Sequence, residues 1–107
     1  MSVIMTLQMH GDPDRLEAFA AENQDSIRGI SDKAKEHGLT AHRFYGSDDG
    51  QIMVVDEWPD VQSFQRFFEE MAPTIGPMFE AVGVTEEPRP TFWRKLDTHD
   101  EVGWEDR

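Results

Sequence analysis

The order in which two kinds of hydrophobic periodicity follow one another constrains the fold more than any other feature of the chain. Alternation of apolar and polar residues predicts strands near residues 2–10, 40–46, 51–58 and 91–96. Apolar residues spaced by three and four predict helices over residues 13–37, 60–72 and 74–82. A kink or a break is expected between the last two, because proline removes a backbone hydrogen bond and Pro73 and Pro77 lie inside the pattern. The predicted order is βαββαβ.

Polar residues and glycines mark the ends of these elements. Asp12 and Asp60 are the predicted N-caps of the two helical regions, and Pro13 suits a first helical position. Gly38 is the predicted stop of the first helix. Ser47–Gly50 has the composition of a hairpin loop, so the second and third strands are predicted to pair directly.

Two helical regions cannot cover both faces of a four-stranded sheet. We therefore expect both to pack on one face, in the ferredoxin-like α+β arrangement with an antiparallel sheet. The other face is expected to display residues drawn from Ile4, Thr6, Gln8, Tyr45, Val54 and Trp93. Such a face is too apolar to be left entirely to water, and we expect a second copy of the chain to cover it in a homodimer. A monomer with one solvated sheet face is the alternative.

The charge of the chain excludes several classes of partner. Its 107 residues include 22 Asp plus Glu and 10 Lys plus Arg, for a net charge of −12, and no cysteine. This balance argues against nucleic acid and anionic membrane surfaces as partners. The N-terminus lacks a secretory pattern, and we expect a cytoplasmic protein. One domain is expected over residues 1–96, followed by an acidic tail over 97–107.

The segment Val54–Phe64 places an acidic residue near Trp58 at the end of a strand, followed by a capped helix. In this it resembles the dimeric α+β barrel superfamily and, within it, the antibiotic biosynthesis monooxygenase-like group. The resemblance implies a homodimer with sheets packed face to face, and a pocket between sheet and helices in each subunit. The heme-degrading branch is disfavoured, since its iron-binding histidine falls near Pro77 and residues 59–90 contain no histidine.

Four polar residues are candidates for catalysis: His42, Asn23, Tyr45 and Arg43. Histidine is the usual base near neutral pH, and Asn23 interrupts an apolar helical stripe. Tyr45 and Arg43 are candidates for holding oxygen atoms of a substrate. Each has a structural alternative: a surface histidine on a strand, an amide bound to backbone, and an arginine paired with an acid.

Aromatic side chains are the candidates for lining a flat apolar pocket. They are Phe44, Trp58, Phe67, Phe68 and Trp93. Aromatic residues at helical and strand spacing are also ordinary core residues. No pair of histidines has metal-ligand spacing, so no metal site is predicted.

The resemblance implies a cofactor-independent monooxygenase acting on a phenolic or polycyclic aromatic molecule, with His42 as the base. Two alternatives stay open at this point. One is a non-catalytic small-molecule-binding or accessory protein of the same fold. The other is a small-ring isomerase or dehydratase in which His42 works with Glu57 as an acid–base pair.

Overall fold

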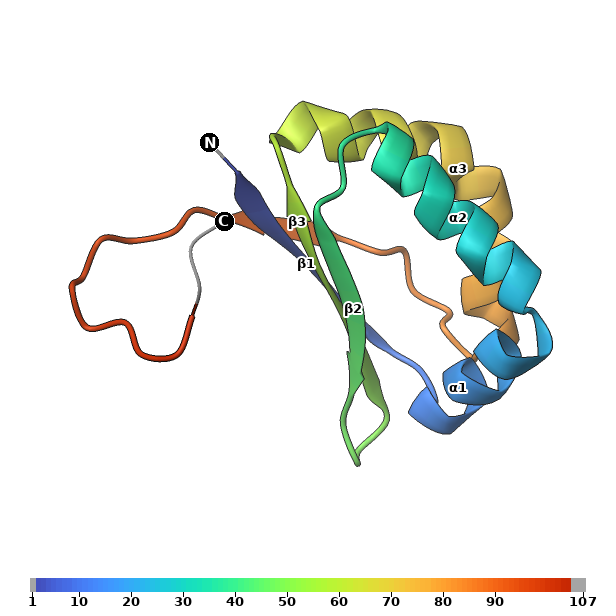
Figure 1. The fold of residues 1–107 in the computed structure, drawn as a ribbon. Coiled ribbons are helices and arrows are strands. Elements are labelled where there is room, and N and C mark those ends of the chain that lie inside the picture. Colours follow the sequence, from blue (N-terminus) through green and yellow to red (C-terminus); the bar gives the residue numbers. More distant parts are fainter. Residues whose placement is uncertain (1, 105–107) are drawn as a thin grey trace.

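The protein was studied as a computed structural model, which describes residues 2–104. Its elements follow in the order β1 (Val3–His10), α1 (Pro13–Glu22), α2 (Gln24–Glu36), β2 (Ala41–Gly46), β3 (Gln51–Trp58), α3 (Val61–Ala81) and β4 (Pro90–Trp93). The four strands form one antiparallel sheet in the order β2-β3-β1-β4. All three helices lie on the same face of this sheet (Figure 1). This is the ferredoxin-like α+β arrangement that the periodicities predict.

The alternation of the two central strands divides the sheet into a buried face and an open face. Met5, Leu7 and Met9 of β1 are buried toward the helices, whereas Gln8 and His10 are exposed. In β3 every second residue is buried, and Val54 is one of them at 5% exposure. The expectation that Val54 lies on the open face is therefore wrong, because the period of two places it with Met5 and Leu7.

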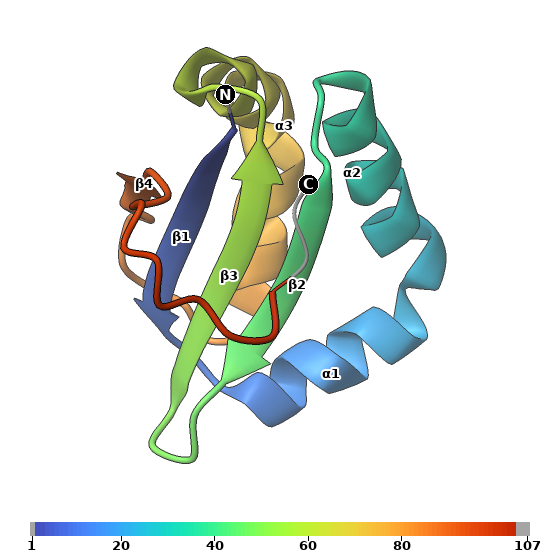
Figure 2. The ribbon, with the colours of Figure 1, turned by 60° about the vertical axis from the view of Figure 1, so that its left-hand side comes forward.

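The first predicted helix is two helices. α1 ends at Glu22 and α2 begins at Gln24, with Asn23 between them at φ −131° and ψ 44°. Both the backbone N–H and the side-chain Nδ2 of Asn23 donate to the carbonyl oxygen of Phe19, each at 2.9 Å. A short amide that bonds locally to the backbone favours a helix end over a helix interior. The break lets α2 change direction and run along the edge of the sheet (Figure 2).

The second helical region is kinked and not broken, so of the two expected alternatives the kink is the one that the structure has (Figure 1). α3 is continuous over 21 residues and contains both Pro73 and Pro77, although it bends along its length (Figure 1). The two prolines are four residues apart on the exposed side of the helix. The carbonyl groups that they leave without a helical partner therefore face water, which makes the missing hydrogen bonds tolerable. Across residues 2–104 no helix has the length and apolarity needed to span a membrane.

Both predicted helix caps are present. The Asp12 carboxylate accepts hydrogen bonds from the backbone N–H groups of Asp14 and Arg15, and the Asp60 carboxylate accepts one from Ser63 at 2.7 Å. Gly38 follows α2 with φ +105°, a conformation open to glycine and strained for other residues. The Asp60 cap and Gly38 mark the start of α3 and the end of α2, the two helices that form the wall of the cavity described below.

The open face of the sheet carries large exposed side chains. Tyr45 is 48% exposed and Trp93 is 54% exposed, and the Trp93 indole donates to the Thr6 hydroxyl at 2.8 Å. The last strand ends at Trp93, earlier than predicted. Trp93 pairs with Ile4, and β1 begins at Val3, so β1 offers almost no further backbone for the residues after Trp93 to pair with. The following chain leaves on the side away from the helices and passes in front of β1, β3 and β2 (Figure 2). Trp104 is 85% exposed.

Candidate functional site

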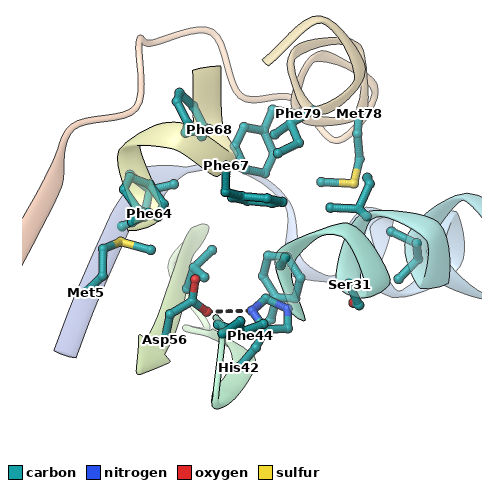
Figure 3. Close-up of a pocket in the computed structure, with 17 residues that line it drawn as sticks. Met5, Ser31, His42, Phe44, Asp56, Phe64, Phe67, Phe68, Met78 and Phe79 are labelled. Atoms are coloured by element: carbon teal, nitrogen blue, oxygen red, sulfur yellow. Dashed lines mark hydrogen bonds and ion pairs between the residues drawn. The ribbon is translucent and has the colours of Figure 1, made fainter. Parts of the chain in front are cut away.

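A cavity of about 70 Å³ lies between the sheet and the helices. β1, β2 and β3 form its floor, and α2 and α3 form its walls (Figure 3). Its lining is apolar except for three side chains, those of Ser31, His42 and Asp56. The apolar lining consists of Met5, Leu7, Ile27, Ile30, Ala34, Leu39, Phe44, Val54, Phe64, Phe67, Phe68, Ile75, Met78 and Phe79.

His42 and Asp56 form a hydrogen-bonded pair on the floor of this cavity. His42 Nδ1 lies 2.6 Å from Asp56 Oδ1 (Figure 3). The Asp56 side chain is 7% exposed, whereas that of His42 is 30% exposed. A carboxylate this buried must be hydrogen-bonded, because a desolvated charge without partners is strongly destabilising. The pair therefore joins the buried Asp56 carboxylate to the partly exposed His42 ring.

Trp58 holds the second oxygen of the same carboxylate. Its Nε1–H donates to Asp56 Oδ2 at 3.1 Å, and the indole is fully buried, at 0% exposure. Phe64 and Phe67 pack around the indole, with ring centroids 5.7 and 5.4 Å away. Because a tryptophan N–H can only donate, Oδ2 is fixed as an acceptor. The result is a hydrogen-bonded chain in which the Asp56 carboxylate links Trp58 to His42.

Strand geometry explains why these three side chains meet. Asp56 and Trp58 are two residues apart on β3, so both point to the helix face of the sheet. β2 pairs with β3 in the register that places His42 directly opposite Asp56. Side chains directly opposite in an antiparallel pair lie on the same face and within contact distance. Asp56 therefore receives one donor along its own strand and one across the sheet.

This arrangement determines which nitrogen of His42 is available for chemistry. A carboxylate accepts and cannot donate, so Asp56 favours the tautomer with hydrogen on Nδ1. Within residues 2–104, Nε2 of His42 has no hydrogen-bond partner, and its lone pair is free to take a proton. A histidine with Nδ1 tied to a carboxylate and Nε2 exposed to substrate is the arrangement of a general base.

An ion-pair cluster at the surface joins α2 to α3 beside the cavity wall. Glu70 contacts Lys33 Nζ at 3.3 Å and His37 Nε2 at 3.4 Å, and His37 packs against the cavity residue Phe67. The hydrogen bond from Lys33 lowers the pKa of the Glu70 carboxyl below its usual value, and the same bond raises the pKa of Lys33. The cluster is exposed, so it contributes little to stability, and it marks where α2 and α3 meet beside the cavity.

The structure brings four of the nine predicted site residues into one cavity. Of the four catalytic candidates, His42 lines the cavity, and of the five aromatic candidates, Phe44, Phe67 and Phe68 line it. The His42 ring meets Phe44 edge-on at 5.0 Å. Trp58 lies beneath the lining and acts on the cavity through Asp56.

The other candidates lie elsewhere. Asn23 sits at the junction of α1 and α2 with its amide on the Phe19 carbonyl oxygen, outside the cavity lining. Arg43 and Tyr45 alternate with His42, so they point to the open face, where the Arg43 guanidinium donates to the Tyr45 hydroxyl at 3.3 Å. Trp93 lies on that open face as well. A site that combines these four with His42 does not form within one subunit.

Sequence reasoning missed Asp56 as a site residue, and also Ser31 and the apolar face of α2. A signal for Asp56 existed. It is the one acidic residue in the buried alternation of β3, between Val54 and Trp58. A charged residue in an otherwise apolar strand face needs a partner and is a common mark of a functional site. Among residues 2–104 no three His, Asp or Glu side chains gather in a way that would hold a metal ion.

Solved structures with the same fold are known. No family model and no curated protein matches the sequence. Among solved structures, the chain is similar to a monooxygenase of Streptomyces coelicolor from the gene ActVA-Orf6, in complex with nanaomycin D. The TM-score is 0.69 at 14% identity, over 94% of this chain and 93% of that one. It is also similar to SnoaB of Streptomyces nogalater, a cofactor-independent oxygenase, with a TM-score of 0.62 at 14% identity over 94% and 98%.

A dimeric ferredoxin-like protein from an uncultured marine organism is a third similar structure, with a TM-score of 0.64 at 14% identity over 94% of this chain and 93% of that one. Putative antibiotic biosynthesis monooxygenases from Bordetella bronchiseptica and Deinococcus radiodurans share the fold as well. The chain thus has the ferredoxin-like fold of the antibiotic biosynthesis monooxygenase-like proteins. Because the identities are low, the comparison defines the fold, and activity has to be argued from the site.

Proposed function

We propose that this protein is a cofactor-independent monooxygenase that oxidises a small phenolic aromatic molecule. The observation that carries the proposal is the His42–Asp56 pair at 2.6 Å on the floor of an apolar cavity. Similar structures include a monooxygenase and a cofactor-independent oxygenase, which is consistent with it. The polar candidates Arg43, Tyr45 and Asn23 have no part in this version of the site.

In the proposed reaction, His42 Nε2 removes the hydroxyl proton of a bound phenol, and Asp56 stabilises the imidazolium that results. The electron-rich ring carbon opposite the oxygen then forms a bond to O₂, which gives a hydroperoxide. Loss of water breaks the O–O bond and leaves a quinone. Phenol plus O₂ gives quinone plus water, so the substrate supplies all the electrons and no separate reductant is needed.

Oxygen uptake by the purified protein with a panel of phenols tests the proposal. We expect His42→Gln to lower the rate by about 10²–10⁴-fold, the usual contribution of a general base. His99→Gln is the matched control, because His99 is exposed in the tail and is 83% accessible. Wild-type protein without uptake on any phenol, or full activity of His42→Gln, would overturn the proposal.

A non-catalytic binding protein is the second candidate function. It is favoured by the lining, in which 14 of the 17 side chains are apolar. Saturable binding of phenols by wild-type protein without oxygen uptake would select it over the oxygenase. The isomerase alternative with His42 and Glu57 is weakened, because Glu57 points to the open face and contacts Ser2 and Thr40.

We also propose that the open sheet face forms a homodimer, and we keep a cytoplasmic location as a prediction. Tyr45 and Trp93 expose large aromatic surfaces there. Asp56 turns inward, so Glu57 is the one acidic strand residue on this face within the described chain. Strands nearly free of acids suit self-association of a chain with charge −12. The acidic segment that follows Trp93 passes in front of these strands, so the proposed dimer requires it to lie aside from the contact (Figure 2).

Light scattering is the test of the dimer. Wild-type protein is expected to have twice the chain mass, and Tyr45→Glu is expected to be monomeric at the same concentration. Gln65→Glu adds the same charge on the exposed side of α3 and should remain dimeric. A monomeric wild-type protein would refute the interface.

A further inference from the structure

We infer that the substrate is an uncharged molecule with a single aromatic ring, and that anionic phenols and fused polycyclic phenols are rejected. The inference rests on the proposed function and narrows its substrate class. It is carried by two properties of the cavity that are independent of each other, its size and the charge of its lining.

The size of the cavity limits the number of rings. At about 70 Å³ it is smaller than the roughly 150 Å³ cavity that accepts benzene in an engineered protein, and far below the ~300 Å³ at which drug-sized pockets begin. One ring fits if flexible side chains such as Met78 adjust, since methionine repacks readily. Three fused rings would require α2 and α3 to separate, which would expose the apolar lining that both helices contribute to the cavity.

The charge of the lining excludes anionic substituents. Of the 17 lining residues none is Lys or Arg, and Asp56 is itself acidic. Its partners are already assigned, because Oδ1 bonds to His42 and Oδ2 bonds to Trp58. A carboxylate or phosphate on the substrate would therefore lie close to another negative charge, and its one possible cationic partner in the lining is a protonated His42, which could then no longer act as the base. Burying an anion that lacks a partner is strongly unfavourable.

A neutral phenol meets none of these obstacles. Its ring packs against the wall formed by Ile75, Met78 and Phe79, and its hydroxyl proton is shared with His42 Nε2. The charge that forms when the proton moves is an ion pair between the aryloxide and the imidazolium, so no net charge is created in the cavity. The site thus favours a substrate that is neutral on entry and ionises only in contact with His42.

Binding can be measured without turnover, in the absence of oxygen. The Nε1–H of Trp58 lies next to Asp56 and reports on the cavity through its signal in ¹H–¹⁵N NMR spectra, whereas those of Trp93 and Trp104 serve as internal controls outside it. Para-cresol and para-hydroxybenzoate are matched ligands that differ in one substituent, methyl against carboxylate. Naphthol and anthrone extend the series to two and three rings.

We expect para-cresol to shift the Trp58 signal saturably, para-hydroxybenzoate to bind at least about tenfold more weakly, and anthrone not to bind. Ser31→Lys places a cation in the lining and should reverse the preference between the first two ligands. Ile30→Ala removes a half-buried wall residue and should admit naphthol. Since the wild-type series alone decides the question, a variant that fails to fold does not affect the result.

Equal binding of the carboxylate, or binding of anthrone as tight as that of para-cresol, would overturn the inference. Failure of every phenol to shift the Trp58 signal would overturn it too. Selective binding of para-cresol, with no oxygen uptake on any phenol that carries hydrogen opposite its hydroxyl group, would support this specificity and sink the oxygenase proposal, so the two failures are distinguishable.

Discussion

Replacing Asp56 by asparagine tests the central claim about the site, because the new side chain keeps its shape and loses one acceptor. Asp56 accepts two hydrogen bonds, from His42 Nδ1 at 2.6 Å and from Trp58 Nε1 at 3.1 Å. An amide offers one accepting oxygen and one donating NH₂ group. Trp58 can only donate, whereas the His42 ring can exchange its tautomer. The amide oxygen should therefore turn to Trp58 and its NH₂ group to His42.

The consequence is a change of tautomer in Asp56→Asn. His42 Nδ1 must accept from the amide, so its hydrogen moves to Nε2 and the lone pair needed for catalysis is lost. Oxygen uptake is expected to fall by about 10²–10⁴-fold, the contribution of a general base. Stability should fall by only about 1–3 kcal/mol, since a charge-assisted hydrogen bond is replaced by a neutral one and both His42 and Trp58 keep a hydrogen-bond partner.

The assay is ¹⁵N NMR of the His42 ring, which distinguishes the two tautomers directly, together with thermal unfolding. The double variant with Asp56→Asn and Trp58→Phe removes the donor that fixes the amide. Its amide is then free to turn its oxygen to His42, and the hydrogen should return to Nδ1. A ring that keeps hydrogen on Nδ1 in the single variant, with activity retained, would refute the reasoning about Trp58 and Asp56.

Two further predictions concern the helices. Hydrogen bonds from Ser63 lower the pKa of the Asp60 carboxyl in the folded protein. The stabilisation by this cap is therefore complete above the unfolded-state pKa and disappears as the pH falls through the lowered folded-state pKa. Asp60→Ala should destabilise the protein at neutral pH and match wild type in acid, as measured by urea unfolding at a series of pH values. Asn23→Ala removes the bond to the Phe19 carbonyl oxygen and should lower stability by about 0.5–1.5 kcal/mol without changing ligand shifts at Trp58. Loss of those shifts would instead give Asn23 a part in the site.

How far the sequence predicts the fold depends on which interactions set each element. The strand over residues 51–58 has the predicted bounds, because its alternation is a local property and determines the buried face. Periodicity predicts one helix over residues 13–37, because the apolar stripe continues past Asn23. The bond from Asn23 Nδ2 to the Phe19 carbonyl oxygen is a local alternative that periodicity does not weigh.

The candidate site shows a different limit. Alternation alone places Asp56 with Val54 on the buried face, so a buried carboxylate was within reach of sequence reasoning. Its pairing with His42 was not, because it depends on strand register. A four-residue loop over 47–50 would pair Gly46 with Gln51 and place His42 opposite Val55. The observed register pairs Gly46 with Ile52, and this shift by one residue brings His42 opposite Asp56.

Glu57 provides the matched control for every statement about Asp56. The two acids are neighbours on β3 and point to opposite faces, with Glu57 near Ser2 and Thr40 on the open side. Glu57→Gln removes one negative charge, as Asp56→Asn does, so both variants change the overall field of the protein alike. We expect Glu57→Gln to keep the His42 tautomer and the rate of oxygen uptake, because no hydrogen bond joins Glu57 to the cavity. A loss of activity equal to that of Asp56→Asn would show that charge alone matters, or that His42 works with Glu57. Retained activity would assign the effect to the orientation of His42 by Asp56.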